Sequence, residues 1–257
     1  RGAKMGGLCT AGYSLAKAGL LDGKRATIHW ENQAAFSEEF PEAHLSNLLY
    51  VVDEGVFTCA GGTSSADMML HLISRDLTRA GYWHFDPTLQ ASGDNPFQNL
   101  MNQLRIQGHK GESPDSCILF SYDLDQDGLV GVGACTGADC AAETGNDNDN
   151  VEQFGFRLRG SRVQSRYGGS GLECDSGYWQ TLNDPAVEVT RLKFTQHSSC
   201  QNLLESEPEC TPESPRLIQR AVEIQLSGQL RNKPVIDTTI IQWVRIRNAQ
   251  LSEGTPP

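Results

Sequence analysis

Two short stretches of the sequence carry residue types that could do chemistry. The first is "KMGGLCTAGYSL", in which Cys9 lies in a Gly-x-Cys-x-x-Gly turn between a predicted strand and a predicted helix. Such a turn exposes a thiol at a helix N-terminus, where the dipole favours the nucleophilic thiolate. His29 ends the next predicted strand, "RATIHW", and is the candidate base. The structural alternatives are a packed turn cysteine and a strand-end histidine bound to backbone.

The second stretch is "DLDQDG", which places carboxylates at Asp123, Asp125 and Asp127 before a glycine turn. This alternation opens oxygen-ligand calcium loops. The twelfth loop position is Ala134 rather than a glutamate, so the pattern is not an EF-hand. Further oxygens could come from the nearby "ETGNDNDN" loop. The alternative is a solvated acidic β-turn, which Asp and Gly favour for conformational reasons.

Eight cysteines are unevenly spread, because only Cys9 and Cys59 precede residue 83. Six in the remaining chain, with two close pairs, indicate disulfides and an oxidising compartment, although six buried thiols are the alternative. Six cysteines allow about 15 connectivities. We expect the close pairs to form small loops and the remaining pair to form a long link: Cys135–Cys140, Cys200–Cys210 and Cys117–Cys174. No cysteine set has the spacing of a tetrahedral zinc site.

Composition limits the classes of function. The net charge of −11 argues against a broad nucleic-acid surface. No apolar run approaches the roughly 18 residues that a membrane-spanning helix needs, so we expect no span in this chain. We also expect no signal peptide at its start.

Periodicity predicts the elements that position these residues. Strands alternate with a helix before residue 62, with a hairpin turning at residues 53–55, which indicates a parallel α/β layer. Residues 64–83 form a predicted amphipathic helix, with Leu70, Ile73 and Leu77 on its apolar face. A short helix is expected within residues 95–108. Beyond it, runs such as "QFGFRLRGSRVQSRY" alternate apolar and polar residues, which predicts half-buried antiparallel strands with one solvated face. The final pair of strands is expected to be joined by a loop containing Pro234.

Residues 1–74 resemble a known superfamily through "CTAGYSLAKAGLLDGKRATIHW" and "FPEAHLSNLLYVVDEGVFTCAGGTSSADMMLHLI". The superfamily is the class I glutamine amidotransferase-like (PfpI) group, and the closest likeness is to the ligand-sensing domain of AraC-type regulators. The resemblance implies that Cys9 sits at the nucleophile elbow and that His29 stands where the regulators carry a histidine. Thr10 replaces the histidine that enzymes of the group often carry. The family's earlier strands and the acidic partner of the cysteine precede this point and are not in the sequence, and no helix-turn-helix follows residue 83.

Residues 75–257 are similar to the soluble domain of PilW-type minor pilins of type IV pili. The likeness rests on "RDLTRAGYW", "PDSCILFSYDLDQDG", "EQFGFRLRG", "ECDSGYWQTLND" and "RAVEIQLSGQLRN". It implies a helix packed on an antiparallel sheet, no catalysis, a role in initiating or priming pilus assembly, and other minor pilins as partners. A pilin would carry an apolar anchoring helix where the amidotransferase-like segment stands here.

The sequence therefore predicts a hybrid α+β chain. Its parts are an incomplete α/β (flavodoxin-like) segment at 1–62, a shared junction helix at 63–83 and a pilin-like, disulfide-rich β domain at 84–257. The predicted function is a non-enzymatic minor-pilin-like ectodomain, and the alternative is a ligand-sensing or hydrolase-like domain of an AraC-type regulator. The first places the chain in the periplasm or on the cell surface, the second in the cytoplasm. Calcium is the one cofactor suggested, and self-association is expected through the exposed edge of the α/β segment.

Overall fold

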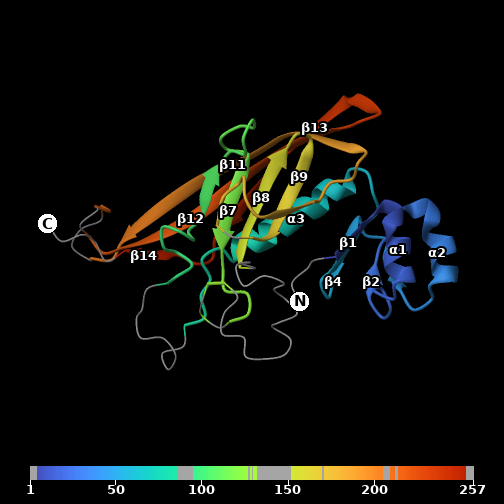
Figure 1. Ribbon diagram of the computed structural model, residues 1–257, viewed down its shortest axis with the longest axis horizontal. Coiled ribbons are helices and arrows are strands. Elements are labelled where there is room, and N and C mark those ends of the chain that lie inside the picture. The colour runs from blue at the N-terminus through green and yellow to red at the C-terminus, as the bar shows by residue number, and fades with distance from the viewer. Residues whose placement is uncertain are drawn as a thin grey trace. The chain divides into compact units, whose positions relative to one another are not determined.

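The computed structural model describes residues 5–85, 95–126, 128, 130–131, 152–169, 171–204, 209–211 and 214–252 (Figure 1). The chain divides into two compact units. Unit 1 comprises Arg1–Leu72, Leu182–Glu188 and Gly228–Thr238, and unit 2 comprises Ile73–Thr181, Val189–Ser227 and Thr239–Pro257. The architecture is mixed: a small N-terminal α/β region, one longer helix, and then antiparallel sheets.

Unit 1 opens on a short strand, a turn and a helix. Its elements in chain order are β1 (Met5–Leu8), η1 (Cys9–Ala11), α1 (Gly12–Lys17), β2 (Arg25–Ala26), η2 (Trp30–Asn32), α2 (Gln33–Glu39), β3 (His44–Leu45), β4 (Tyr50–Asp53) and β5 (Val56–Cys59). β1 pairs with β5 in parallel, and β2 pairs with β3 in parallel. β4 pairs with β5 antiparallel, so the sheet of order β1-β5-β4 is mixed rather than purely parallel.

The hairpin between β4 and β5 turns where the sequence predicts it. Glu54 and Gly55 have φ angles of 44° and 80°, so both central residues are left-handed. Two positive φ angles characterise the type I′ turn, whose twist matches that of the flanking strands. The acidic-glycine pair therefore sets the register of Asp53 opposite Val56.

β5 is buried on both faces. Val56 belongs to one apolar cluster with residues of α1 and α2, including Leu15 and Phe36. Phe57 and Cys59 belong to a second cluster with Met68 and Leu72. Successive side chains of a strand point to opposite faces, so this strand supplies both small cores of unit 1.

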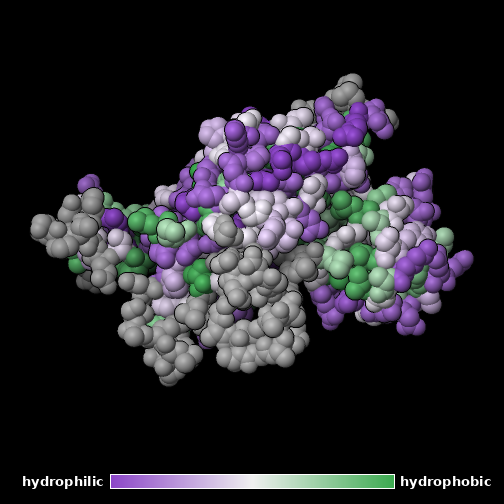
Figure 2. All heavy atoms as spheres, viewed as in Figure 1, coloured by the Kyte–Doolittle hydropathy of each residue, from purple (hydrophilic) through white to green (hydrophobic). Residues whose placement is uncertain are grey.

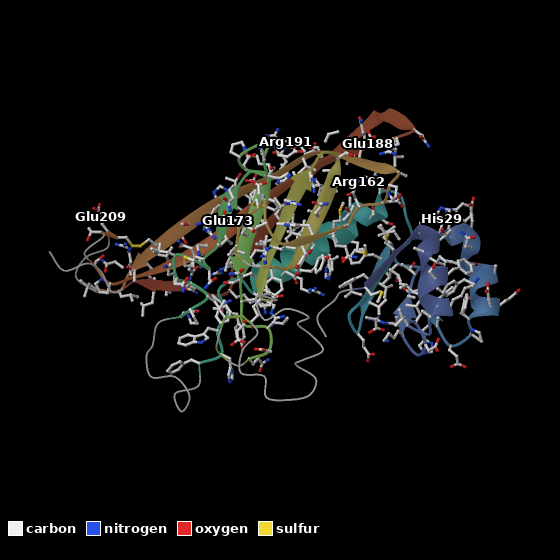
Figure 3. The ribbon with its side chains drawn as sticks, viewed as in Figure 1. His29, Arg162, Glu173, Glu188, Arg191 and Glu209 are labelled. Atoms are coloured by element: carbon white, nitrogen blue, oxygen red, sulfur yellow. A yellow bond between two sulfur atoms is a disulfide. The ribbon has the colours of Figure 1, made fainter. Side chains whose placement is uncertain are left out.

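The two later segments of unit 1 are tied to each other by polar contacts. The Glu188 carboxylate accepts hydrogen bonds from Arg231 at 3.1 Å and from Gln229 at 3.3 Å. The Arg231 N–H also donates to the carbonyl of Ala186 at 2.9 Å. Glu188 is labelled in Figure 3.

The predicted amphipathic helix is α3 (Ser64–Thr78). Ser64 and Ser65 donate from their hydroxyls to the carbonyls of Gly61 and Gly62, which fixes its start. Its apolar face is buried, as Leu70, Ile73 and Leu77 are exposed by 6%, 0% and 0%.

α3 ends five residues earlier than the pattern predicts. The carbonyl of Thr78 accepts from the N–H of Arg247 at 3.1 Å. The Asn248 amide donates to the carbonyls of Arg79 and Ala80 at 3.1 and 3.2 Å. A segment distant in sequence therefore satisfies carbonyls that the next helical turn would have used.

The first sheet of unit 2 has five antiparallel strands in the order β10-β9-β8-β7-β6. Their bounds are β6 (Arg105–Gln107), β7 (Cys117–Ser121), β8 (Gln153–Arg159), β9 (Arg162–Gly168) and β10 (Tyr178–Thr181). Figure 1 shows β7, β8 and β9 as adjacent arrows. The predicted hairpin near Gly160 is confirmed, because Arg159 pairs with Arg162 across a two-residue turn.

The second sheet has four strands: β11 (Val187–Asn202), β12 (Arg216–Leu230), β13 (Lys233–Arg245) and β14 (Gln250–Ser252). Its order is β11-β12-β13, and β14 also pairs with β12. The expected loop containing Pro234 is wrong, because Pro234 lies within β13 and the turn falls at residues 231–232. β13 is at the edge of this order, where a strand tolerates a residue without an N–H.

The short helix expected within residues 95–108 is also wrong, since this stretch contains turns followed by β6. The Asn95 side chain accepts from the N–H of Phe97, and the Asn99 side chain accepts from those of Met101 and Asn102. Asparagine side chains that bind nearby backbone in this way favour turns over helix.

The solvated face expected for the alternating strands is present in β12 but not in β8. β12 alternates buried and half-buried residues, whereas β8 is buried at six successive positions. On the polar face of β8, Arg157 is only 3% exposed and lies 4.1 Å from the ring of Trp179. The Trp179 side chain of β10 thus covers Arg157, which alternation alone did not indicate.

In the view of Figure 2, the surface over β7, β8 and β9 is mainly hydrophilic to neutral. Within the described part of the chain, no helix has the length and apolar character needed to cross a membrane.

Candidate functional site

The cysteine elbow lies directly after β1. Cys9 has φ 54°, an uncommon left-handed value for a non-glycine residue, and its side chain is partly exposed. A Cβ on Gly61 would lie 2.7 Å from the Cβ of Cys9, so only glycine permits this approach. The strand-turn-helix arrangement that the resemblance implies is therefore present at Cys9.

The contacts of His29 are with residues close to it in the sequence. Its Nδ1 lies 3.8 Å from the Glu31 carboxylate, and its ring contacts that of Trp30 (Figure 3). Among the described residues no hydrogen bond joins His29 to Cys9. Since nucleophilic catalysis needs an adjacent, oriented base, the catalytic assignment of these two residues stays a prediction.

The acidic candidates lie at the end of β7. Ligand oxygens of Asp123, Asp125 and Glu152 all lie within 4.8 Å of one another. Asp123 and Glu152 are fully buried, while Asp125 is exposed. Asp127 lies outside the described residues. Carboxylate oxygens are the ligands that calcium prefers, so these three residues could supply part of a calcium shell.

The two buried carboxylates also organise the loop after β7. Asp123 accepts from the backbone N–H groups of His84 at 2.9 Å, Gln126 at 2.6 Å and Gly128 at 3.1 Å. Glu152 accepts from the N–H groups of Leu124 at 2.6 Å and Gly131 at 3.0 Å. The cluster therefore has a structural role that does not depend on a metal.

Burial raises the pKa of Glu152 from 4.5 to about 8, although the N–H groups of Leu124 and Gly131 oppose the shift. The neighbouring carboxylates Asp125 and Asp123 raise it further. Glu152 therefore holds a proton over much of the neutral range, and a divalent cation would have to displace that proton.

Sequence reasoning missed Glu152. It directly precedes β8, and Asp123 follows β7 by two residues; Ser121 pairs with Gln153 in the antiparallel ladder. The pairing of "CILFSYDLD" with "EQFGFRLRG" was the signal that could have found it, because antiparallel partners bring those two strand ends together.

Within the described residues, unit 2 holds two disulfides, and these are two of the three predicted pairs. They are Cys117–Cys174 and Cys200–Cys210, with sequence separations of 57 and 10. The third expected pair, Cys135–Cys140, lies outside the described residues. Cys9 and Cys59 are free thiols.

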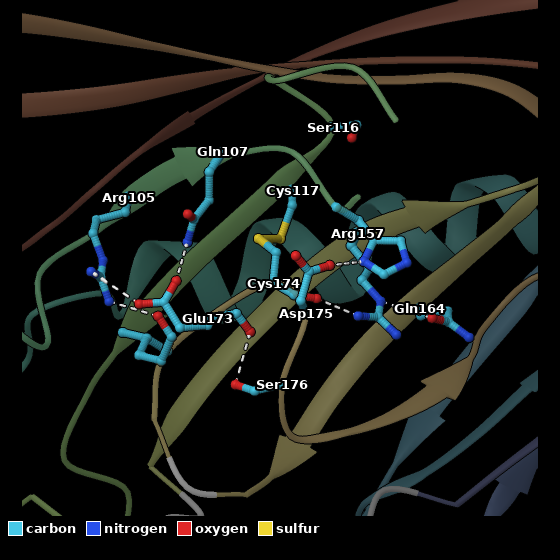
Figure 4. Close-up of a disulfide and its surroundings, with 12 residues drawn as sticks. Arg105, Gln107, Ser116, Cys117, Arg157, Gln164, Glu173, Cys174, Asp175 and Ser176 are labelled. Atoms are coloured by element: carbon cyan, nitrogen blue, oxygen red, sulfur yellow. Dashed lines mark hydrogen bonds and ion pairs between the residues drawn. A yellow bond between two sulfur atoms is a disulfide. The ribbon is translucent and has the colours of Figure 1, made fainter. Parts of the chain in front are cut away.

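Polar contacts surround the Cys117–Cys174 disulfide (Figure 4). Arg157 donates to the carbonyl of Cys174 and, at 2.9 Å, to Gln164. Arg105 donates to the carbonyl of Leu172 at 2.6 Å. The Asp175 carboxylate accepts from the N–H of Lys110 at 3.1 Å, and this hydrogen bond lowers the pKa of Asp175. The segment 172–175 between β9 and β10 is thus hydrogen-bonded to β6, to β8 and to the segment that follows β6.

Comparison with known proteins places this helix and these antiparallel sheets in a family. The chain belongs to the family described as prepilin peptidase-dependent protein B, whose model matches residues 63–246. An uncharacterized protein of Haemophilus influenzae is 22% identical over 188 residues, which cover 65% of this chain and 71% of that protein.

The N-terminal segment has different relatives. It is 47% identical over 76 residues to the HTH-type transcriptional regulator GbdR of Pseudomonas aeruginosa, covering 30% of this chain and 21% of that regulator. The regulator CdhR of the same species is 47% identical over 74 residues, which cover 29% of this chain and 22% of CdhR. A crystal structure of an AraC family transcriptional regulator from Pseudomonas putida matches with 30% identity and a TM-score of 0.28, over 29% of this chain and 40% of that chain. The chain spans only about a fifth of the curated regulators' length. Its N-terminal segment resembles part of the sensing domain of AraC-type regulators.

Proposed function

We propose that the chain is a minor-pilin-like ectodomain that acts without catalysis in the initiation or priming of type IV pilus assembly. The family match over residues 63–246 carries this proposal. It is supported by the antiparallel sheets of unit 2 and by the end of α3, which is fastened to β7 where the Gly81 N–H donates to the carbonyl of Ser121 at 2.8 Å. The partners would be other minor pilins.

Family membership and the two disulfides suggest an extracytoplasmic location, since disulfides persist in oxidising compartments. Within that setting we place the pilin-like part in the periplasm or at the cell surface. The amidotransferase-like segment would be located there as well, and β1, at the edge of its sheet in the described part of the chain, would offer backbone groups for self-association.

The alternative is a ligand-sensing or hydrolase-like domain of an AraC-type regulator. The 47% identity to GbdR over 76 residues favours this alternative. The position of His29 Nδ1 3.8 Å from the Glu31 carboxylate, with no hydrogen bond to Cys9 among the described residues, argues against hydrolysis.

Binding to purified minor-pilin ectodomains tests the main proposal. Sedimentation velocity of mixtures should show a heterologous complex for the full chain and for a Cys9→Ala variant alike, because unit 2 carries the interaction. Esterase and amidase assays should show no turnover above the Cys9→Ala background. Turnover that the Cys9→Ala substitution abolishes, with no pilin complex, would establish the alternative instead.

A further inference from the structure

The two free cysteines approach each other at the end of the β1–β5 ladder. Cys59 ends β5 and pairs with Leu8 in parallel register, and Cys9 follows Leu8 directly. Leu8 is extended, with φ −98° and ψ 131°, so the chain continues its strand direction to the Cα of Cys9. Strands about 4.8 Å apart with a rise of about 3.3 Å per residue then place the two cysteine Cα atoms roughly 6 Å apart. Disulfides span about 4.4–6.8 Å between Cα atoms.

Both thiols face the same glycine. A Cβ built on Gly61 would lie 2.9 Å from the Sγ of Cys9. The backbone N–H groups of Gly61 and Cys9 lie near the Cys59 thiol and act to lower its pKa. The Cys9 sulfur atom therefore lies against Gly61, and the Cys59 thiol lies near the backbone of the same glycine. Gly61 has no side chain, so it places no side-chain atom between the two thiols.

The two thiols differ in access. Cys9 is partly exposed, whereas Cys59 is fully buried among Phe57, Met68 and Leu72. Burial raises the pKa of the Cys59 thiol, and the two N–H groups oppose the shift. A reagent in solution reaches Cys9 first, and Cys59 is positioned as the second, resolving thiol.

We propose that Cys9 and Cys59 are a redox-active pair that closes to an intramolecular disulfide when the chain meets a small-molecule disulfide such as oxidised glutathione. The Cys9 thiolate attacks one sulfur of the oxidant, forms a mixed disulfide and releases one glutathione thiolate. The Cys59 thiolate then attacks the Cys9 sulfur and releases the second glutathione. The two protein thiols lose two electrons and two protons, and the oxidant is reduced to two thiols.

Formation of the Cys9–Cys59 disulfide would leave Cys9 without a free thiol for any other reaction. The chain would then carry no free thiol among its described cysteines in an oxidising compartment, which is where its other disulfides suggest it resides. The pair would thus make the segment compatible with that compartment. This inference rests on unit 1 alone and does not depend on the proposed pilus function.

Peptide mapping of the full chain tests the pair. Protein purified without reductant is incubated with oxidised glutathione, quenched in acid, unfolded, alkylated and digested. We expect a crosslinked peptide joining Cys9 to Cys59 and no lasting glutathione adduct. A Cys59→Ala variant is the matched control, since it keeps the accessible thiol and should retain glutathione on Cys9.

Two outcomes would overturn the proposal. One is a persistent glutathione adduct on Cys9 of the wild-type chain, with Cys59 alkylated only after unfolding. The other is full alkylation of both thiols after incubation, which would mean that neither reacts. The wild-type map decides between these results even where the variant fails to fold.

Discussion

Replacing Glu152 with glutamine should remove a large pH dependence from the stability of unit 2. Glu152 is fully buried, and its pKa is raised from 4.5 to about 8. Since the folded state holds the proton more tightly, the contribution of Glu152 to the free energy of unfolding is highest below pH 4.5 and falls as the pH rises towards 8. A shift of this size corresponds to about 5 kcal/mol at about 1.4 kcal/mol per pKa unit, as an order of magnitude.

The Glu152→Gln variant carries no charge at any pH, so this fall should disappear. Glutamine keeps one carbonyl oxygen to accept from Leu124 or Gly131, and losing the other hydrogen bond should cost about 1 kcal/mol at pH 5. At pH 8.5 the variant should therefore be the more stable of the two proteins.

Urea unfolding between pH 5 and pH 9, with a chelator present and the disulfides intact, measures the effect. Tryptophan fluorescence reports on it, and a Trp30→Phe background removes the exposed tryptophan of unit 1. Asp125→Asn is the comparison variant: Asp125 is exposed and its charge is a smaller cause of the raised Glu152 pKa than burial, so this variant should reduce the pH dependence of unfolding only slightly. Parallel stability curves for wild type and Glu152→Gln would refute the reasoning.

Three further outcomes are expected. Millimolar calcium should raise the melting temperature of the wild type but not of Asp125→Ala, and no wild-type shift would remove the calcium prediction. Replacing both cysteines of the Cys117–Cys174 disulfide, whose sequence separation is 57, by serine should lower the free energy of unfolding by about 4 kcal/mol on a loop-entropy model, against about 3 kcal/mol for Cys200–Cys210. Chemical denaturation measures both losses, and a larger loss for Cys200–Cys210 would contradict the prediction. Asn248→Ala should destabilise unit 2 by about 1–2 kcal/mol, because it leaves carbonyls at the end of α3 without a donor. The exposed turn variant Asn232→Ala should be neutral in the same thermal melts.

Features set by neighbouring residues could be predicted from the sequence. The β4–β5 and β8–β9 hairpins follow from glycine turns between alternating strands. The buried face of α3 follows from the spacing of Leu70, Ile73 and Leu77. The close spacing of Cys200 and Cys210 indicates their disulfide, and Cys117–Cys174 is the pair that remains after the two close pairs are assigned.

Features set by distant residues could not be predicted in this way. The end of α3 depends on Asn248, about 170 residues away, and the acidic cluster depends on Glu152 meeting Asp123 across a strand pair. The burial of Arg157 depends on a loop whose path only the Cys117–Cys174 link reveals. Each is a tertiary contact that overrides a local preference.

The burial of the Cys117–Cys174 disulfide beside β8 has a consequence for how fast it can be reduced. Cys117 and Cys174 are exposed by 0% and 2%, beneath Trp179 and the Arg157 side chain. A reductant must collide with a sulfur atom along the S–S axis, so it can act only when the segment 172–177 before β10 moves away from the disulfide. The rate at which the Cys117–Cys174 bond is reduced in the folded chain therefore measures how often that segment opens. The measurement needs no added probe, because the disulfide itself reports the opening.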